Sequence, residues 1–140
     1  MILVSCSTPA IRYYRVSPSP DTSMIYFKAA SIEGEKITPY LDGLVIDRVS
    51  MALIQYGIPA TETVHLIAKE YMAMAIGYPI TDMDMRVCDS KNNLIVWDTA
   101  IDKAAGVSFK AVPGPHIFLL DSPNMSEVQG MYYFILAHKP

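Results

Sequence analysis

The sequence is poor in charge and in cysteine, and it has no long apolar run. Charged residues make up 18% of the 140 residues, and there are two cysteines. No stretch approaches the run of about 20 apolar residues that a membrane-spanning helix needs. We therefore expect no membrane span. The sequence also contains no glycine-rich phosphate loop and no nucleophile-elbow motif, so no motif in it specifies a chemistry.

The two cysteines, Cys6 and Cys88, can pair only if the fold brings them together. Two free buried thiols in a reducing compartment are the commoner arrangement for such a pair. We accordingly expect a cytoplasmic protein, or one incorporated in a particle assembled in the cytoplasm. Residues 3–6, Leu-Val-Ser-Cys, have the residue types that precede a bacterial lipoprotein cleavage site. The part before them is too short for a signal peptide. Lipoprotein export is therefore expected only if the true start lies upstream of Met1.

The charge balance argues against a nucleic-acid partner. The net charge is −3 and the isoelectric point is near 5.5. Residues 12–15, Arg-Tyr-Tyr-Arg, combine basic and aromatic side chains as single-strand binders do. Two arginines are far too few for a basic groove, so we expect no nucleic acid.

Apolar residues are unusually frequent. They make up 51% of the chain, and the mean hydropathy is +0.24. Typical soluble domains contain about 25% charged residues, well above the value here. An apolar excess without a membrane span indicates that part of the surface is buried in subunit contacts. The expected partner is another copy of the chain or another protein subunit.

The segment 38–77 predicts two helices folded back on each other, over about 39–56 and 60–76. Thr38 with Pro39 is typical of a helix start, and Gly57 and Gly77 are typical of helix ends. Between these signals, apolar residues recur at spacings of three and four, which favours amphipathic helices. The short link between the two predicted helices makes them antiparallel neighbours.

The rest of the chain predicts strands. Before the helical segment these are Ile2–Val4, Ile11–Val16 and Met24–Ala30, with Ser31–Ile37 as a loop or short edge strand. After it they are Thr81–Val87, Leu94–Thr99, Val107–Val112, His116–Asp121 and Gly130–His138. The last of these is apolar on both faces, as in a strand covered on two sides. Residues 89–93 predict the turn of a β-hairpin.

Strands and helices in separate blocks predict an α+β fold. We expect one domain over residues 1–140, with a mainly antiparallel sheet of about six or seven strands. The central two-helix hairpin would pack on one face of this sheet. The alternative is a β-sandwich with the helical hairpin inserted.

No set of residues predicts a metal or cofactor site. Asp82 and Asp84 share a strand face, but Arg86 follows them on that face, and a solvated charged face is the favoured interpretation. Residues 89–93 lack the glycine and the distal glutamate of a calcium loop. The three histidines, His65, His116 and His138, have no metal-ligand spacing. A dyad of Cys88 with His116 stays open, although an inert buried thiol is the simpler interpretation.

The first predicted helix is apolar nearly all round, and this makes it the main functional clue. Ile46, Met51 and Ile54 fall outside the apolar stripe that would pack on the sheet. We therefore take these three residues as the candidate interface. The leading hypothesis is a non-catalytic assembly subunit, such as a component of a viral or phage particle. The alternative is a small-ligand domain with a pocket lined by methionine and tyrosine. An enzyme that uses a cysteine or a histidine is the third interpretation.

Overall fold

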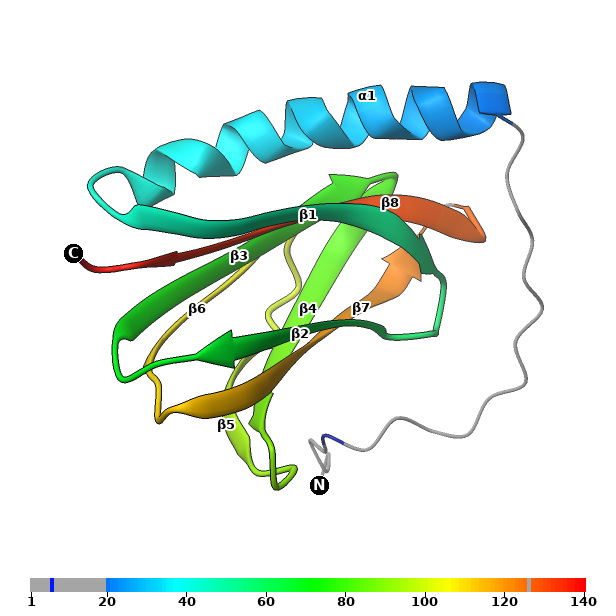
Figure 1. The fold of residues 1–140 in the computed structure, drawn as a ribbon. Helices are drawn as coiled ribbons and strands as arrows, with labels where there is room; N and C mark the ends of the chain where they lie inside the picture. The colour runs from blue at the N-terminus through cyan, green and yellow to red at the C-terminus, as the bar shows by residue number, and fades with distance from the viewer. Residues whose placement is uncertain (1–5, 7–19, 126) are drawn as a thin grey trace.

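The described part of the chain folds into two four-stranded antiparallel sheets that pack face to face, with one long helix across the outer face of one sheet (Figure 1). The structure is a computed structural model, and it describes residue 6 and residues 20–140 except residue 126. Within these residues no helix is long and apolar enough to cross a membrane. The predicted strands Ile2–Val4 and Ile11–Val16 lie outside the described residues.

Each sheet takes its strands from distant parts of the chain. Sheet A has the order β1 (Val45–Gln55), β8 (Gln129–His138), β3 (Glu70–Tyr78) and β6 (Ala105–Lys110). Sheet B has the order β2 (Ala60–Leu66), β7 (Gly114–Met125), β4 (Ile80–Asp89) and β5 (Leu94–Asp98). The helix α1 (Pro20–Ile37) and the short 3₁₀ helix η1 (Thr38–Leu41) precede β1. Every pair of neighbouring strands is antiparallel.

Two apolar layers hold these elements together. The main core lies between the sheets and centres on Phe118 and Phe134, whose rings meet edge to face at 5.2 Å between centroids. A second layer lies between sheet A and α1. It contains Ile37, Leu41, Met74, Ile76, Ile135 and Ala137. Sheet A is therefore apolar on both faces, and α1 is needed to cover its outer one.

The predicted helical hairpin is wrong. Segment 38–77 supplies η1 and the three strands β1, β2 and β3, so neither the α+β fold nor the sandwich with an inserted hairpin is correct. The misleading feature is β3, where Ala73 and Ala75 face the main core while Met74 and Ile76 face α1. A strand that is buried on both faces also places apolar residues at helical spacings. Gly57, with φ of 75°, forms the turn between β1 and β2 and does not end a helix.

The prediction of a strand at Met24–Ala30 is also wrong, because this segment lies within α1. Tyr26 and Phe27 favour strands, but the buried positions Ala30, Gly34 and Ile37 recur at three- and four-residue spacing. Packing against sheet A therefore overrides local propensity. The predicted loop or edge strand at Ser31–Ile37 is the second half of the same helix.

The strands predicted after Gly77 are confirmed as β4 to β8. The hairpin of β4 and β5 is confirmed by their antiparallel pairing. Strand β8 lies between β1 and β3, with Phe134 in the main core and Ile135 under α1. This confirms that its apolar run is covered on both faces. Strand β7 is longer than predicted, because it continues through segment 122–125.

Docking of α1 depends on a close approach at Gly34. A Cβ atom at this position would lie 2.5–2.6 Å from ring carbons of Tyr133 on β8. We predict that Gly34→Ala costs about 1–2 kcal/mol in unfolding free energy, because the steric conflict outweighs the helix propensity that alanine gains. Urea unfolding measures this cost. Gly106→Ala is the control, since its Cβ would meet only Met74 side-chain atoms at 3.7 Å or more. A Gly34→Ala protein as stable as the parent would contradict this account of the docking.

Candidate functional site

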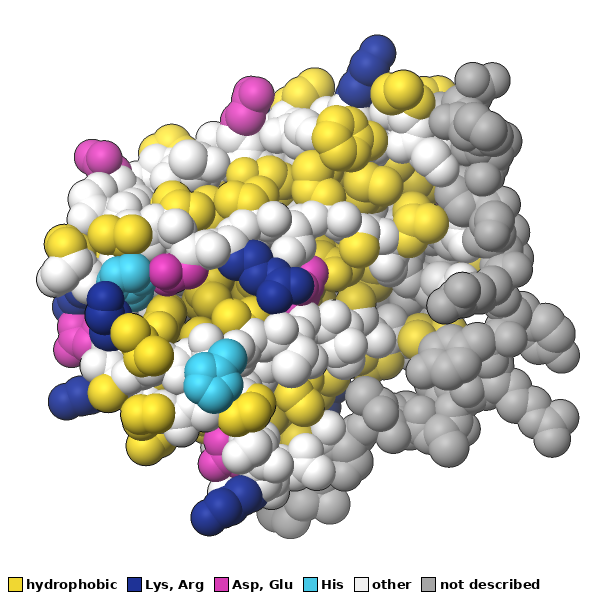
Figure 2. Space-filling model, viewed as in Figure 1, with side chains coloured by type: hydrophobic (Ala, Val, Ile, Leu, Met, Phe, Trp, Pro, Cys, Tyr) yellow, Lys and Arg dark blue, Asp and Glu magenta, His cyan; other side chains and the backbone are white. Residues whose placement is uncertain are grey.

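The outer side of β1 and the adjoining side of α1 form an exposed apolar surface, here called the apolar strip. It consists of Met24 and Phe27 from α1 and of Val49, Met51 and Leu53 from β1. Phe27 and Val49 are each 50% exposed and Leu53 is 40% exposed. Apolar side chains gather along α1 and β1 in the view of Figure 2. Large apolar side chains grouped on one face are typical of protein contacts.

The strip exists because α1 lies over β3 and β8 and leaves β1 beside it. The hydroxyl of Ser31 donates to Met51 Sδ at 3.7 Å, which identifies the side of α1 that faces β1. Phe27 is four residues before Ser31 and Met24 is seven before it, so both lie on this side. On β1, Val49 and Leu53 alternate with core-facing Ala52 and Ile54, and they point to the outer face.

The two charged residues of β1, Asp47 and Arg48, each contact another side chain within the chain. The guanidinium of Arg48 forms an ion pair with Glu62 on β2 at 2.7 Å, and Tyr132 on β8 donates its hydroxyl to the same carboxylate at 2.7 Å. Burial and the Glu62 carboxylate raise the pKa of Tyr132, so this hydroxyl stays protonated. Asp47 Oδ2 lies 2.6 Å from His138 Nδ1. The contacts of Glu62 join the two sheets at the side where β1 and β2 lie, whereas Asp47 and His138 join β1 to β8 within sheet A.

The structure does not bring the three predicted interface residues together. Ile46 is exposed, Met51 is half-buried in the apolar strip, and Ile54 is 2% exposed within the core between the sheets. These three residues share a face only in a helix. The segment is a strand, and its successive side chains point to opposite faces. Contact of these residues with a partner stays a prediction.

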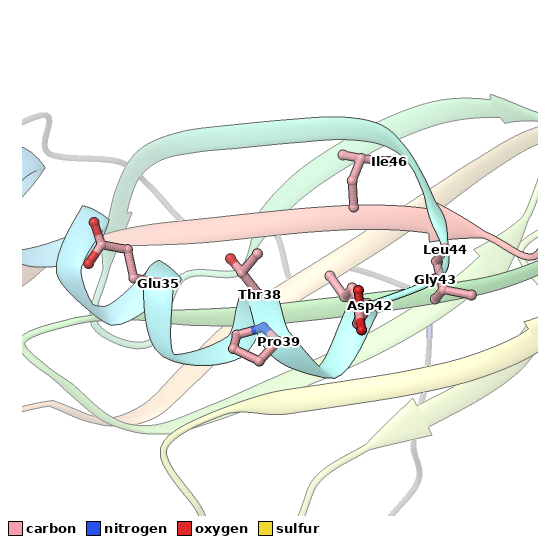
Figure 3. Close-up of a pocket in the computed structure, with 8 residues that line it drawn as sticks. Glu35, Thr38, Pro39, Asp42, Gly43, Leu44 and Ile46 are labelled. Carbon is pink, nitrogen blue, oxygen red and sulfur yellow. The ribbon is translucent and has the colours of Figure 1, made fainter.

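Two hollows lie near the turn from α1 to β1. The larger, about 540 Å³, is lined by Ile46, Leu44 and residues of α1 and η1 (Figure 3). The smaller, about 260 Å³, includes Tyr40, Tyr71 and Met72 in its lining. The small-ligand hypothesis expected a pocket lined by methionine and tyrosine between the sheet and a helical hairpin. That hairpin is absent, so the hypothesis stays a prediction with this smaller hollow as its location.

Acidic side chains cluster on sheet B, and the expected solvated face is not what the structure has. Asp82 is 7% exposed, and Asp84 lies opposite Asp121 in the pairing of β4 with β7. One oxygen atom of each of these three carboxyl groups is buried without a hydrogen-bond partner. Burial, together with the charges of Asp82, Asp121 and Asp98, raises the pKa of Asp84 to about 6. Arg86, two residues along β4, does not prevent this shift.

No group of three or more histidine, cysteine or acidic residues within the described part of the chain could hold a metal ion.

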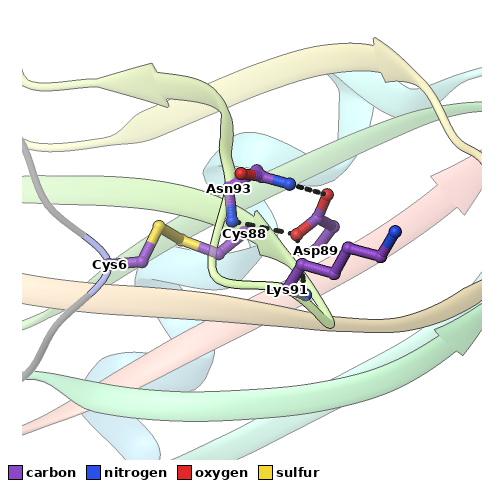
Figure 4. The surroundings of a disulfide bond; sticks show 5 residues. All are labelled: Cys6, Cys88, Asp89, Lys91 and Asn93. Carbon is purple, nitrogen blue, oxygen red and sulfur yellow. Dashed lines mark hydrogen bonds between the residues drawn. A yellow bond between two sulfur atoms is a disulfide. The ribbon is translucent and has the colours of Figure 1, made fainter.

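The prediction of two free thiols is wrong, because Cys6 and Cys88 form a disulfide (Figure 4). Their Cα atoms are 6.3 Å apart and the residues are 82 positions apart in sequence. The sulfur of Cys88 is therefore no nucleophile for a dyad with His116. The neighbouring turn is confirmed, since the Asp89 carboxylate accepts hydrogen bonds from the backbone N–H groups of Lys91 and Asn93 at 2.9 Å.

The histidines have separate surroundings. His65 is exposed on β2. His116 is buried, and its Nδ1 lies 2.9 Å from the carbonyl oxygen of Gly114. His138 lies between Asp47 and Lys69, whose Nζ is 3.2 Å from His138 Nε2.

Several residues of the site were missed by sequence reasoning. The sequence predicts a strand for Met24 and Phe27, which lie on α1. The contact of Arg48 with Glu62 joins two segments for which the sequence predicts separate helices. The sequence signal for the correct structure is a hairpin pattern. Segments 45–55 and 60–66 can each be interpreted as a strand, and Gly57 permits a tight turn between them. Nothing in the sequence indicated that Tyr132, 70 positions from Glu62, would contact its carboxylate.

Two stacked antiparallel sheets define the class of this chain as a β-sandwich. Its fold is similar to that of the pre-peptidase C-terminal domain of collagenase from Bacillus anthracis, known from a 1.0 Å crystal structure. The two have a TM-score of 0.54 and 13% sequence identity, and the match covers 65% of this chain and 89% of that one. At this identity the likeness concerns the fold alone. No protein-family model and no curated protein matches the sequence.

The acidic cluster gives a pH-dependent prediction. Because the folded state raises the pKa of Asp84 from 3.8 to about 6, the protonated carboxyl stabilises the fold at low pH. This stabilisation is lost as the pH rises through about 6. At pH 8 the unfolding free energy of Asp84→Asn should therefore be about 1–2 kcal/mol higher than that of the parent, after allowance for partial solvent screening. The gain should vanish below about pH 4.

Denaturant unfolding at several pH values measures this difference. Asp42→Asn is the matched control, because Asp42 is an exposed carboxylate in the turn before β1. It measures the effect of replacing a carboxylate outside the acidic cluster. A gain for Asp84→Asn that is equal at pH 4 and pH 8 would contradict the proton linkage.

Proposed function

We propose that this chain is a non-catalytic assembly subunit that associates with further copies of itself through the apolar strip. The observation that supports the proposal is the exposure of Phe27, Val49 and Leu53 side by side on one face. Covering such side chains gains free energy in proportion to the apolar area removed from water, at about 25 cal/mol per Å². A component of a viral or phage particle is one form of such a subunit, and it stays a prediction on which the fold does not bear.

The charges of the surrounding residues support the same proposal. Charged residues are depleted at the centre of protein interfaces because their desolvation is costly. Strand β1 has two charged residues, and both are already paired within the chain, Asp47 with His138 and Arg48 with Glu62. A protein surface that covers the strip therefore does not have to neutralise Arg48, and Asp47 keeps a hydrogen-bonding contact within the chain.

The apolar strip makes a direct prediction about mass in solution. Light scattering of the purified chain over rising concentrations should give a mass above that of one chain. Phe27→Lys and Leu53→Lys should each lower this mass, because each places a charge in the strip. Ile101→Lys is the matched control, since Ile101 is a 90% exposed apolar residue in the connection between β5 and β6. A parent protein that stays monomeric at high concentration would contradict the proposal.

We also propose that the chain works in an oxidising compartment and not, as the free-thiol interpretation predicted, in the cytoplasm. Disulfides form and persist outside the reducing cytosol, and the Cys6–Cys88 bond supports such a location. The lipoprotein interpretation of residues 3–6 would use the same Cys6 sulfur for lipid attachment. The two modifications therefore exclude each other, and residues 3–5 lie outside the described residues.

The disulfide makes a prediction about stability. Removing a link that encloses 82 positions should cost about 2–5 kcal/mol of unfolding free energy. Dithiothreitol should therefore lower the urea midpoint of the parent, and Cys6→Ser should show the lower midpoint with or without the reductant.

The proposed compartment is tested by alkylating the protein as it is taken from its source, without prior reduction, which measures whether the two cysteines are free or bonded there. Labelling of both cysteines there would contradict the proposed compartment.

A further inference from the structure

Strand β1 differs from the other edge strands of the sandwich. It has 11 residues, whereas the edge strands β2, β5 and β6 have 7, 5 and 6. It pairs with β8 on one side, and no strand in the described part of the chain pairs with its other side. Natural edge strands are usually protected by short length, by lysine or by proline. Strand β1 contains neither lysine nor proline, and its β-bulge and its inward-pointing Arg48 lie at residues 46–48, so segment 49–55 of its edge has none of these protections.

The side chains of β1 also favour contact with an identical strand. Arg48 is paired with Glu62 and Asp47 contacts His138, so neither of its two charged residues lacks a partner within the chain. Its outer face presents Val49, Met51 and Leu53 in alternation. In an antiparallel pair with Met51 opposite its own copy, Val49 lies opposite Leu53 of the second copy. Centring the pair on Ser50 would instead place Asp47 opposite Leu53, which opposes a carboxylate to an apolar side chain.

We propose that two copies of this chain join by antiparallel pairing of their β1 edges, with Met51 on the twofold axis. This inference rests on the proposed function, because it names the partner and the way in which the strip associates. The two copies of sheet A would form one continuous sheet across the dimer. Both apolar strips would lie on the same side of that sheet, where Val49 and Leu53 of each copy cover one another.

The geometry of the pair can be tested by charges placed across it. Val49→Lys and Leu53→Glu should each weaken the dimer by about tenfold or more, because each variant appears twice in the symmetric contact. The double variant Val49→Lys/Leu53→Glu should restore the dimer to within about threefold, since each lysine then faces a glutamate of the second copy. The two positions are four residues apart on one strand, too far apart to pair within one chain.

Sedimentation equilibrium of the parent and the variants measures these affinities, with Ile101→Lys as control and circular dichroism as the check of folding. A monomeric parent would overturn the proposed function together with this inference. A parent dimer that Phe27→Lys weakens and Val49→Lys does not would overturn the inference and leave the proposed function standing. Single variants that dissociate without rescue in the double variant would overturn the Met51-centred pairing.

A measurement on the unchanged protein keeps the inference testable even where a variant fails to fold. Amide hydrogen exchange should become slower within segment 48–54 as the protein concentration rises. Only alternate residues should respond, because every second N–H of β1 points to the free edge. Exchange in this segment that is independent of concentration, in a protein that is dimeric by mass, would overturn the pairing of β1 edges.

Discussion

The structure depends on the need to cover both faces of β8 and β3. On one face Tyr132 and Phe134 enter the core between the sheets, and on the other Ile135, Met74 and Ile76 would meet water if α1 were absent. Gly34 brings α1 close enough to Tyr133 for this layer to pack tightly. Because one helix is not wide enough to cover four strands, β1 is left beside it. The position of α1 thus creates both the second core layer and the exposed strip.

The outer faces of the two sheets have different chemical character. The outer face of sheet A is apolar, and it is covered in part by α1. On β4 and β7 of sheet B, Asp82, Asp84 and Asp121 lie together with incompletely satisfied oxygen atoms, and their mutual repulsion makes the folded state sensitive to protons. The proposed association would involve sheet A and the pH dependence sheet B, so variants of the two sheets should act independently.

The strands after Gly77 could be predicted because turn residues separate them clearly. The sequence signals before Gly77 are ambiguous for a physical reason. In β3 both faces are buried, so Tyr71, Met74 and Ala75 fit a helical period as well as a strand. For Met24–Ala30 the aromatic pair Tyr26-Phe27 favours a strand, whereas the helix gains its stability from contacts with β3 and β8.

The candidate site was less predictable than the fold. The strip joins α1 to β1, and it becomes visible only when both elements are assigned correctly. The Cys6–Cys88 bond likewise depends on where the fold carries two residues that are 82 positions apart. The predicted interface residues Ile46, Met51 and Ile54 come from the segment that also supplies Val49 and Leu53, and its contact with a partner stays a prediction. Of the three, Ile54 lies in the core, because the segment is a strand and not a helix.

The disulfide also determines how the chain can carry mechanical load. A pulling force applied between the two ends of the chain passes from Cys6 directly to Cys88 through the sulfur atoms. The residues between them, including α1 and β1 to β3, therefore bear no tension along the backbone. Only the part after Cys88 can be drawn out while the bond is intact. Removal of β8 then requires the loss of two ladders of hydrogen bonds, one to β1 and one to β3.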